Sequence, residues 1–259
     1  NSTERPRHEW IGRGLSVLFS ALTIWLVIRL GRRWFNPAAG WWGGMALAVA
    51  PLGVYYGRAF QAEALLLFCA AGALEAHSLW VERRASWALA LSWLCFTGAA
   101  LIKVIPLLWL GLPLLLLHLT PSPQAAAEPP QQTLQRLLRL LLNPWFWVYT
   151  TTALAVTSAW YLHAYQLGES SGLTFGFWGE DSDRSNIQLV LNGSSWLNLA
   201  IRVGLRALLV VGIPFLMIGA IRGWSVGGGR IALGGGIGLL FCTVATMRSS
   251  TVHEYYQFP

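Results

Sequence analysis

Charged residues are scarce in this sequence. Only 11% of its 259 residues are Asp, Glu, Lys or Arg, whereas a soluble domain carries about 25%. Hydrophobic residues make up 55% of the chain, and apolar stretches near or above about 18 residues, long enough to cross the hydrocarbon layer, recur along it. Continuous runs such as LLLFCAAGAL also lack the alternation of membrane β-strands. The composition therefore predicts an all-α, polytopic membrane protein.

Cysteine and lysine are rare as well. Cys69, Cys95 and Cys242 each lie inside an apolar run, without metal-ligand or disulfide-like spacing, so we interpret them as small core residues. Lys103 is the only lysine among 18 basic residues. The arginines lie mostly at the ends of apolar runs, so the net charge of +7 indicates membrane topology, and no nucleic-acid partner is expected.

The apolar pattern predicts about eight membrane spans in one transmembrane domain, residues 1–259. The spans are expected at 14–31, 39–57, 62–80, 86–102, 104–119, 145–166, 201–221 and 231–248. Pro106 predicts a turn or kink between the fourth and fifth. The chain begins with NSTERPRHEW and shows no signal-peptide pattern, and we expect it to be a fragment, incomplete at both ends.

Charge asymmetry predicts the orientation of these spans. When alternate connections are assigned to opposite sides, one set is strongly basic and the other is mixed and leans acidic. The basic set contains Arg29, Arg32, Arg33, Arg83, Arg84, Arg136, Arg139, Arg222 and Arg230. By the positive-inside rule this set is cytoplasmic. The polar residues of the other set, which have no evident topological role, then gather on the outer face.

Residues 121–142 form the longest cytoplasmic connection. The first half is rich in Pro and Ala, which is typical of a flexible linker. The second half places Leu134, Leu137, Leu138, Leu141 and Leu142 on one helical face, with Arg136 and Arg139 off it. This pattern predicts an interfacial amphipathic helix, which we interpret as a membrane-tethered linker.

Three charged residues lie in short outer connections. Arg58 and Glu63 stand in YYGRAFQAEALLL, and Lys103 lies between two apolar spans. They could be interfacial anchors, with Glu63 capping the next helix. Alternatively they are functional, because ionisable groups near the membrane are costly, and a lysine can hold a phosphate.

Two further outer segments carry polar residues. Residues 167–200 are expected to form one long outer-face loop, which contains Glu180, Asp181 and Arg184 beside aromatic residues. The final run, STVHEYYQFP, offers His253, Tyr255 and Tyr256 directly after a span. An ordinary solvated loop and an aromatic belt are the alternatives to a site here.

Taken together, four stretches resemble glycosyltransferases of the C superfamily that use a polyprenyl-phosphate sugar donor. These are YYGRAFQAEALLL, GAALIKVIPLLWLGLPLLL, SAWYLHAYQLGESSGLTFGFWGEDSDR and HEYYQFP. The nearest group is the bacterial branch of protein mannosyltransferase-like enzymes and the lipid A aminoarabinose transferase. Departures from its motifs include Ala62-Glu63 where the family usually has Pro-Asp, and Val104-Ile105 where glycine normally follows the lysine.

The resemblance implies an enzyme that transfers a hexose or pentose at the outer face of a membrane, most simply a bacterial inner membrane. It assigns the lipid phosphate to Arg58, Lys103 and Arg184. Glu63 would be a second catalytic carboxylate, and the substrate would contact Glu180, Asp181, His253, Tyr255 and Tyr256. The acceptor would be a glycan, lipid or protein.

The same resemblance places the principal catalytic acid upstream of Asn1, so the fragment alone is expected to be inactive. A carboxylate would act as general base or hold a divalent metal, and no organic cofactor is implied. The alternative function is a secondary transporter or channel, for which Glu75 and His77 in the third span are the only relay candidates. We interpret that pair instead as polar contacts within the bundle.

Overall fold

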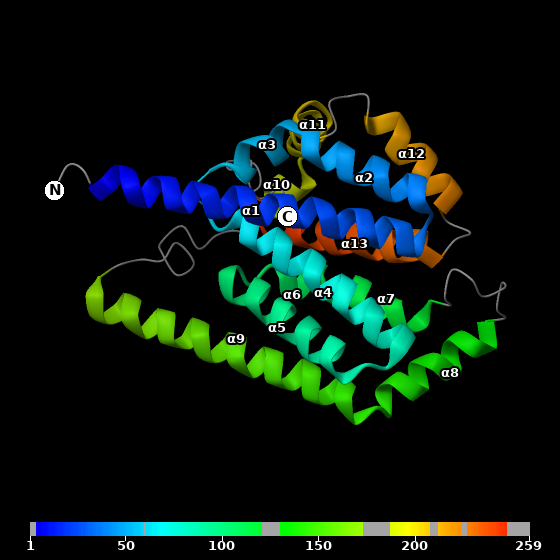
Figure 1. Cartoon of the computed structure of the whole chain (residues 1–259). Helices are drawn as coiled ribbons and strands as arrows, with labels where there is room; N and C mark the ends of the chain where they lie inside the picture. Colours follow the sequence, from blue (N-terminus) through cyan, green and yellow to red (C-terminus); the bar gives the residue numbers. More distant parts are fainter. Residues whose placement is uncertain are drawn as a thin grey trace.

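The structure is a computed structural model that describes residues 4–59, 61–120, 130–172, 187–207, 212–223 and 227–247. Within these ranges the chain is helical, without strands, and the long helices lie side by side as a bundle (Figure 1). The helices are α1 (Glu4–Trp34), α2 (Pro37–Val49), α3 (Pro51–Gly57), α4 (Glu63–Arg83), α5 (Ser86–Ile102), α6 (Pro106–Trp109), α7 (Gly111–Leu119), α8 (Pro130–Leu141), α9 (Pro144–Ser171), α10 (Ile187–Leu191), α11 (Gly193–Arg202), α12 (Gly212–Gly223) and α13 (Gly227–Ala245). The all-α prediction is confirmed.

The count of eight spans is not confirmed. Among the described residues, three helical segments are long and apolar enough to cross a membrane, namely His8–Trp34, Glu63–Arg83 and Gly228–Ala245. Two predicted spans are broken: 39–57 divides into α2 and α3, and 104–119 divides into α6 and α7. The segment predicted as one loop, 167–200, contains the end of α9, the short helix α10 and most of α11.

Proline and asparagine explain where several helices begin. Pro51 and Pro106 occupy first-turn positions of α3 and α6, where the missing N–H group costs nothing. The side chains of Asn36 and Asn143 accept hydrogen bonds from the first turns of α2 and α9. Pro51 therefore starts a new helix inside one predicted span, and Pro106 starts α6 at the predicted break between two spans.

The core lies where α4 and α5 meet α6, α7, α9 and α13. Small residues allow the close approach of α4 and α5, because Ala73, Ala88, Ala99 and Ala100 are fully buried. Larger members of the core include Trp109, Leu110 and Leu117.

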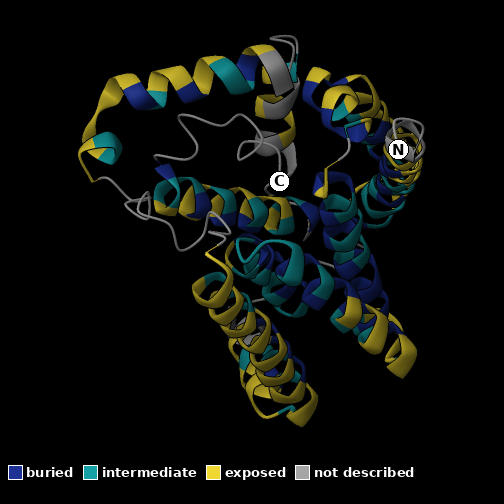
Figure 2. Cartoon of the chain, turned by 90° about the vertical axis from the view of Figure 1, so that its left-hand side faces the viewer, coloured by how far each residue is buried: buried dark blue, intermediate teal, exposed yellow. Residues whose placement is uncertain are grey.

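The outward-facing sides of the helices are apolar. Buried residues concentrate where helices converge, and exposed ones cover their outer sides (Figure 2). Many exposed side chains are large and apolar, among them Leu18, Trp25, Leu94, Leu154 and Phe241. Such a surface fits lipid and not water, and the chain is an integral membrane protein.

Glycine positions in α13 explain how it packs. A Cβ on Gly234 would lie 2.4 Å from Leu116, and one on Gly238 would lie 2.5 Å from the backbone of Trp109. These glycines are four residues apart and therefore share one helical face. The glycine-dense sequence around 227–238 thus serves close packing of α13 against α6 and α7.

The connections gather at two ends of the bundle. In Figure 1 the ends of α1, α4 and α7 lie on the right, with the basic residues at 29–33 and 83–84. The α3–α4 connection and the end of α5 lie on the left. The structure therefore groups the basic connections as the charge pattern predicts, although which end faces the cytoplasm stays a prediction.

Candidate active site

Glu63 and Lys103 form an ion pair at the left-hand end of the bundle. Glu63 is in the first turn of α4, where a carboxylate is favoured by the helix dipole, and Lys103 directly follows the last residue of α5. The Lys103 Nζ atom donates to Glu63 Oε1 at 2.7 Å. The Glu63 side chain is 9% exposed and that of Lys103 is 23% exposed. The lysine thus combines a fixed partner with access from outside.

The backbone after α5 explains the position of the lysine. Lys103 has extended dihedral angles, φ −144° and ψ 139°, so the chain leaves the helix axis at this residue. Pro106 starts α6 three residues later. Because a proline disfavours helical geometry in the residue before it and removes an N–H donor, a continuous helix through this segment is disfavoured.

Arg58 lies at the same end, just after α3. It is exposed and lines a cavity of about 290 Å³ between α1, α2, α3 and α4. The other lining residues are mainly apolar: Val17, Ser20, Ala21, Thr23, Ile24, Leu47, Ala48, Gly53, Val54, Tyr56, Gly57, Ala64 and Leu67. The site therefore places a guanidinium beside an apolar groove, close in sequence to Glu63.

The loop that carries Arg58 is held against α1. The Ser20 hydroxyl donates to the Gly57 carbonyl at 3.4 Å, and that of Ser16 to the Gln61 carbonyl at 3.5 Å. A Cβ at position 57 would lie 2.7 Å from Ser20 Oγ, so a larger residue here would displace the serine hydroxyl. These contacts fix the backbone on both sides of Arg58.

The other predicted site residues lie outside the described residues. These are Glu180, Asp181, Arg184, His253, Tyr255 and Tyr256. Of the nine predicted residues the structure thus places three, Arg58, Glu63 and Lys103, at one end of the bundle. It joins two of them directly.

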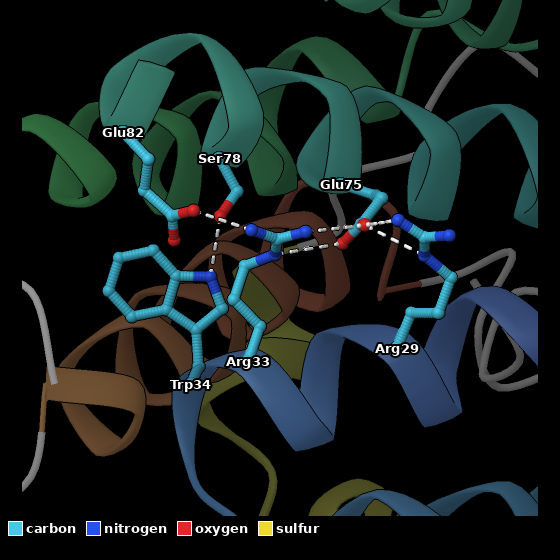
Figure 3. A network of polar contacts seen from close by, with 6 residues as sticks. All are labelled: Arg29, Arg33, Trp34, Glu75, Ser78 and Glu82. Atoms are coloured by element: carbon cyan, nitrogen blue, oxygen red, sulfur yellow. Dashed lines mark hydrogen bonds and ion pairs between the residues drawn. The ribbon is translucent and has the colours of Figure 1, made fainter.

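A second polar network lies toward the opposite end, on α1 and α4 (Figure 3). Glu75, whose side chain is 6% exposed, accepts hydrogen bonds from Arg29 Nε at 2.9 Å and Arg33 Nη2 at 3.0 Å. Arg33 also pairs with Glu82, and Trp34 Nε1 donates to Ser78 Oγ at 2.8 Å. Sequence reasoning did not anticipate this network, although Arg29 and Arg33 are four residues apart and so share a helical face.

His77 also makes contacts within the bundle. Its Nε2 atom lies 2.8 Å from Nε2 of His118, and its Nδ1 atom lies 3.1 Å from the hydroxyl of Ser92, which also contacts Tyr149. Glu75 and His77 therefore both contact other side chains of the protein, which agrees with our interpretation of them as polar contacts within the bundle. Neither forms part of the candidate active site.

The described residues do not suit a metal ion. Within them, no group of three or more His, Cys, Asp or Glu is placed to hold one. Glu63 faces an ammonium group, which competes with a cation for the same carboxylate oxygens. No step of the proposed mechanism is therefore assigned to a metal.

Comparison with known proteins gives one finding. A family model described as dolichyl-phosphate-mannose-protein mannosyltransferase matches residues 6–163, more than half of the chain. The matched region includes Arg58, Glu63 and Lys103. Neither the comparison with curated proteins nor that with solved structures returned a match.

Proposed function

The chain belongs to the dolichyl-phosphate-mannose-protein mannosyltransferase family, and we propose that it transfers a hexose or pentose from a polyprenyl phosphate to an acceptor at the outer face of the membrane. The family consists of membrane glycosyltransferases with lipid-linked sugar donors. The acceptor is a glycan, a lipid or a protein. The membrane is a bacterial inner membrane, and the site faces the periplasm or the exterior. The single observation that carries the proposal is the partly buried Glu63–Lys103 ion pair, at the same end of the bundle as Arg58 and its apolar groove.

The proposed reaction forms one bond and breaks another at the anomeric carbon of the sugar. An acceptor oxygen attacks this carbon, and the bond from the carbon to the phosphate oxygen breaks. The bonding electrons leave with the polyprenyl phosphate, which gains negative charge. Lys103 and Arg58 lie at this end and would stabilise this charge, and Arg184 is proposed to join them.

Lys103 suits this role because Glu63 holds its ammonium group in place while the side chain stays accessible to a phosphate. Its ammonium group is anchored by Glu63, which reduces the reorganisation needed when a phosphate binds. A lysine also has three donors, so it can contact a phosphate oxygen while it keeps the carboxylate. We therefore propose that Glu63 orients Lys103 and also serves as the second carboxylate of the site.

The acceptor proton goes to a carboxylate acting as general base. The principal acid is proposed to lie upstream of Asn1, with Glu63 assisting. Glu180, Asp181, His253, Tyr255 and Tyr256 are proposed to contact the sugar and the acceptor.

The apolar cavity beside Arg58 suits the lipid part of the donor. Most of its lining is aliphatic, and it is bounded by helices that expose apolar side chains outward. A prenyl chain would bury its surface there through the hydrophobic effect, while its phosphate lies near the guanidinium.

The test is to replace Lys103 by Ala in the full-length protein. Transfer of labelled sugar from purified polyprenyl phosphate is measured in proteoliposomes. We expect turnover to fall about 10²- to 10³-fold, the usual effect of removing one electrostatic stabiliser of a transition state. Lys103→Arg, which keeps a cation, should retain more activity than Lys103→Ala.

Arg13→Ala provides the control. Arg13 pairs with Glu9 on the surface of α1, where both side chains are about half exposed. Its removal should leave turnover unchanged, and thermal unfolding of each variant separates loss of chemistry from loss of fold. Normal turnover in Lys103→Ala would refute the proposed role, whereas solute flux without consumption of lipid-linked sugar would favour a transporter.

A further inference from the structure

A second cavity lies at the opposite end of the bundle from Lys103. Its volume is about 370 Å³, and it is enclosed by the ends of α1, α4 and α7 together with α8 and the start of α9. Three arginines line it: Arg84 from the end of α4, and Arg136 and Arg139 from α8. This size lies within the range of ligand pockets.

The charge of this cavity is not balanced by its carboxylate. Glu82 is the only acidic residue among the described residues that line it, and Glu82 already pairs with Arg33. In the described part of the chain, neither Arg84 nor Arg139 is ion-paired. The cavity therefore carries excess positive charge and favours an anion.

The backbone of Arg84 supports a functional reason for its presence. Arg84 ends α4 in the left-handed conformation, with φ 54° and ψ 26°, and its N–H group bonds to the Trp80 carbonyl at 2.8 Å. Glycine normally occupies this position, because a Cβ costs about 1 kcal/mol there. Within the described residues, Arg84 is the only non-glycine residue with positive φ. Backbone strain of this kind clusters at functional sites.

A buried hydroxyl in the cavity has an unused donor. Thr120 lines the cavity and is only 3% exposed, and among the described residues its Oγ1 atom has no hydrogen-bond partner. Buried hydroxyl groups are nearly always hydrogen-bonded. A ligand with acceptor oxygens would satisfy this hydroxyl and the arginines together.

We propose that this cavity binds the phosphate group of an anionic membrane lipid. The lipid is indicated by α8, whose Leu134, Leu138 and Leu141 are exposed beside the cavity while Leu140 lines it. A helix with exposed leucines and with arginines that line a neighbouring cavity fits the membrane surface, at headgroup depth. Arginine suits the ligand because its planar fork binds phosphate oxygens in pairs.

The test measures binding of short-chain lipids to the purified full chain in detergent by native mass spectrometry. The probes are dioctanoyl phosphatidylglycerol, dioctanoyl phosphatidylcholine and inorganic phosphate. The wild type should prefer phosphatidylglycerol over phosphatidylcholine. Arg84→Gly and Arg139→Ala should each weaken phosphatidylglycerol binding by about tenfold or more, the loss expected for one charge-assisted contact.

Arg84→Gly is informative because it removes the cation and also relieves the backbone strain. Its unfolding temperature should equal or exceed that of the wild type, so weaker lipid binding would not reflect misfolding. The control is Arg83→Ala, since Arg83 is exposed on the same helical turn and does not line the cavity. Equal binding by Arg84→Gly, Arg139→Ala and wild type would overturn the proposal. Binding of inorganic phosphate without the lipid would overturn the assignment to a lipid, and neither result bears on sugar transfer.

Discussion

Glu75 carries a buried charge that depends on two arginines of another helix. Its side chain is 6% exposed, and Arg29 and Arg33 both donate to it. Removing one member of a buried ion pair is costly because the remaining charges keep their desolvation without compensation. The stability of the packing between α1 and α4 should therefore depend on Glu75.

We predict that Glu75→Ala destabilises the protein by about 2–4 kcal/mol. This loss is smaller than that expected on breaking a fully buried ion pair, because the Arg29 side chain is 40% exposed. Thermal or denaturant unfolding in detergent measures this difference. Glu9→Ala is the matched control, because it breaks an exposed pair four residues apart on α1 and should cost only about 0.3–0.5 kcal/mol. Similar losses in the two variants would show that burial of Glu75 contributes nothing.

Individual site residues were partly predictable. Arg58, Glu63 and Lys103 stood out because charges are rare in an apolar sequence, and the structure places all three at one end of the bundle. The direct contact of Glu63 with Lys103 was not predicted, because it depends on the rotation of α4 and α5 about their axes. The contacts of Glu75 and of His77 with His118 join residues 41–46 positions apart. Hydropathy carries no information on such pairs.

At the scale of elements, α1 and α2 form a hairpin that depends on glycine. A Cβ on Gly40 would lie 2.5 Å from the carbonyl oxygen of Ile28 and 2.8 Å from the backbone nitrogen of Arg32. Gly31 approaches Gly40 in the same way, since a Cβ on Gly31 would lie 2.6 Å from the Gly40 Cα atom. The two backbones are thus in contact, as small residues permit in membrane helices.

We predict that Gly40→Ala destabilises the protein by about 1–3 kcal/mol, because backbone atoms of α1 would have to move. Gly43→Ala is the control on the same helix, where the new methyl group would meet only Val27 at 3.7 Å. That change should be neutral or slightly stabilising, since alanine is the better helix former. Unfolding midpoints of both variants check this, and equal midpoints would contradict close packing at Gly40.

The positions of the helices were largely predictable, and their interruptions less so. Every predicted span corresponds to helix in the described residues, because long apolar runs leave few alternatives in lipid. The break before Pro106 was expected, but the one before Pro51 was not. Hydropathy stays high across Pro51, and only the missing N–H group marks the change from α2 to α3.

For the whole molecule, the two ends differ in charge. Arg84, Arg136 and Arg139 gather at one end, and the Glu63–Lys103 pair lies at the other. The positive-inside rule assigns the arginine-rich end to the cytoplasm. The candidate active site would then face outward.

We predict that Arg83→Cys is labelled by a membrane-impermeant maleimide only from the cytoplasmic side, and Gln61→Cys only from the outer side. Both positions are exposed and lie in connections at opposite ends. The parental chain, whose Cys69 is partly buried and whose Cys95 and Cys242 are buried, gives the background. Labelling of Gln61→Cys from the cytoplasm would reverse the predicted orientation and, with it, the side of the site.

The Arg33–Glu75 contact also has a consequence for how the chain enters the membrane. Glu75 is added 42 residues after Arg33, a delay of about 2–8 s at ordinary synthesis rates. During that time the last turns of α1 hold two arginines that have not yet met this carboxylate, and these side chains can stay at the headgroups by extending outward. The pair can form once α4 is inserted, so this contact joins α1 to α4 only after both helices are in the membrane.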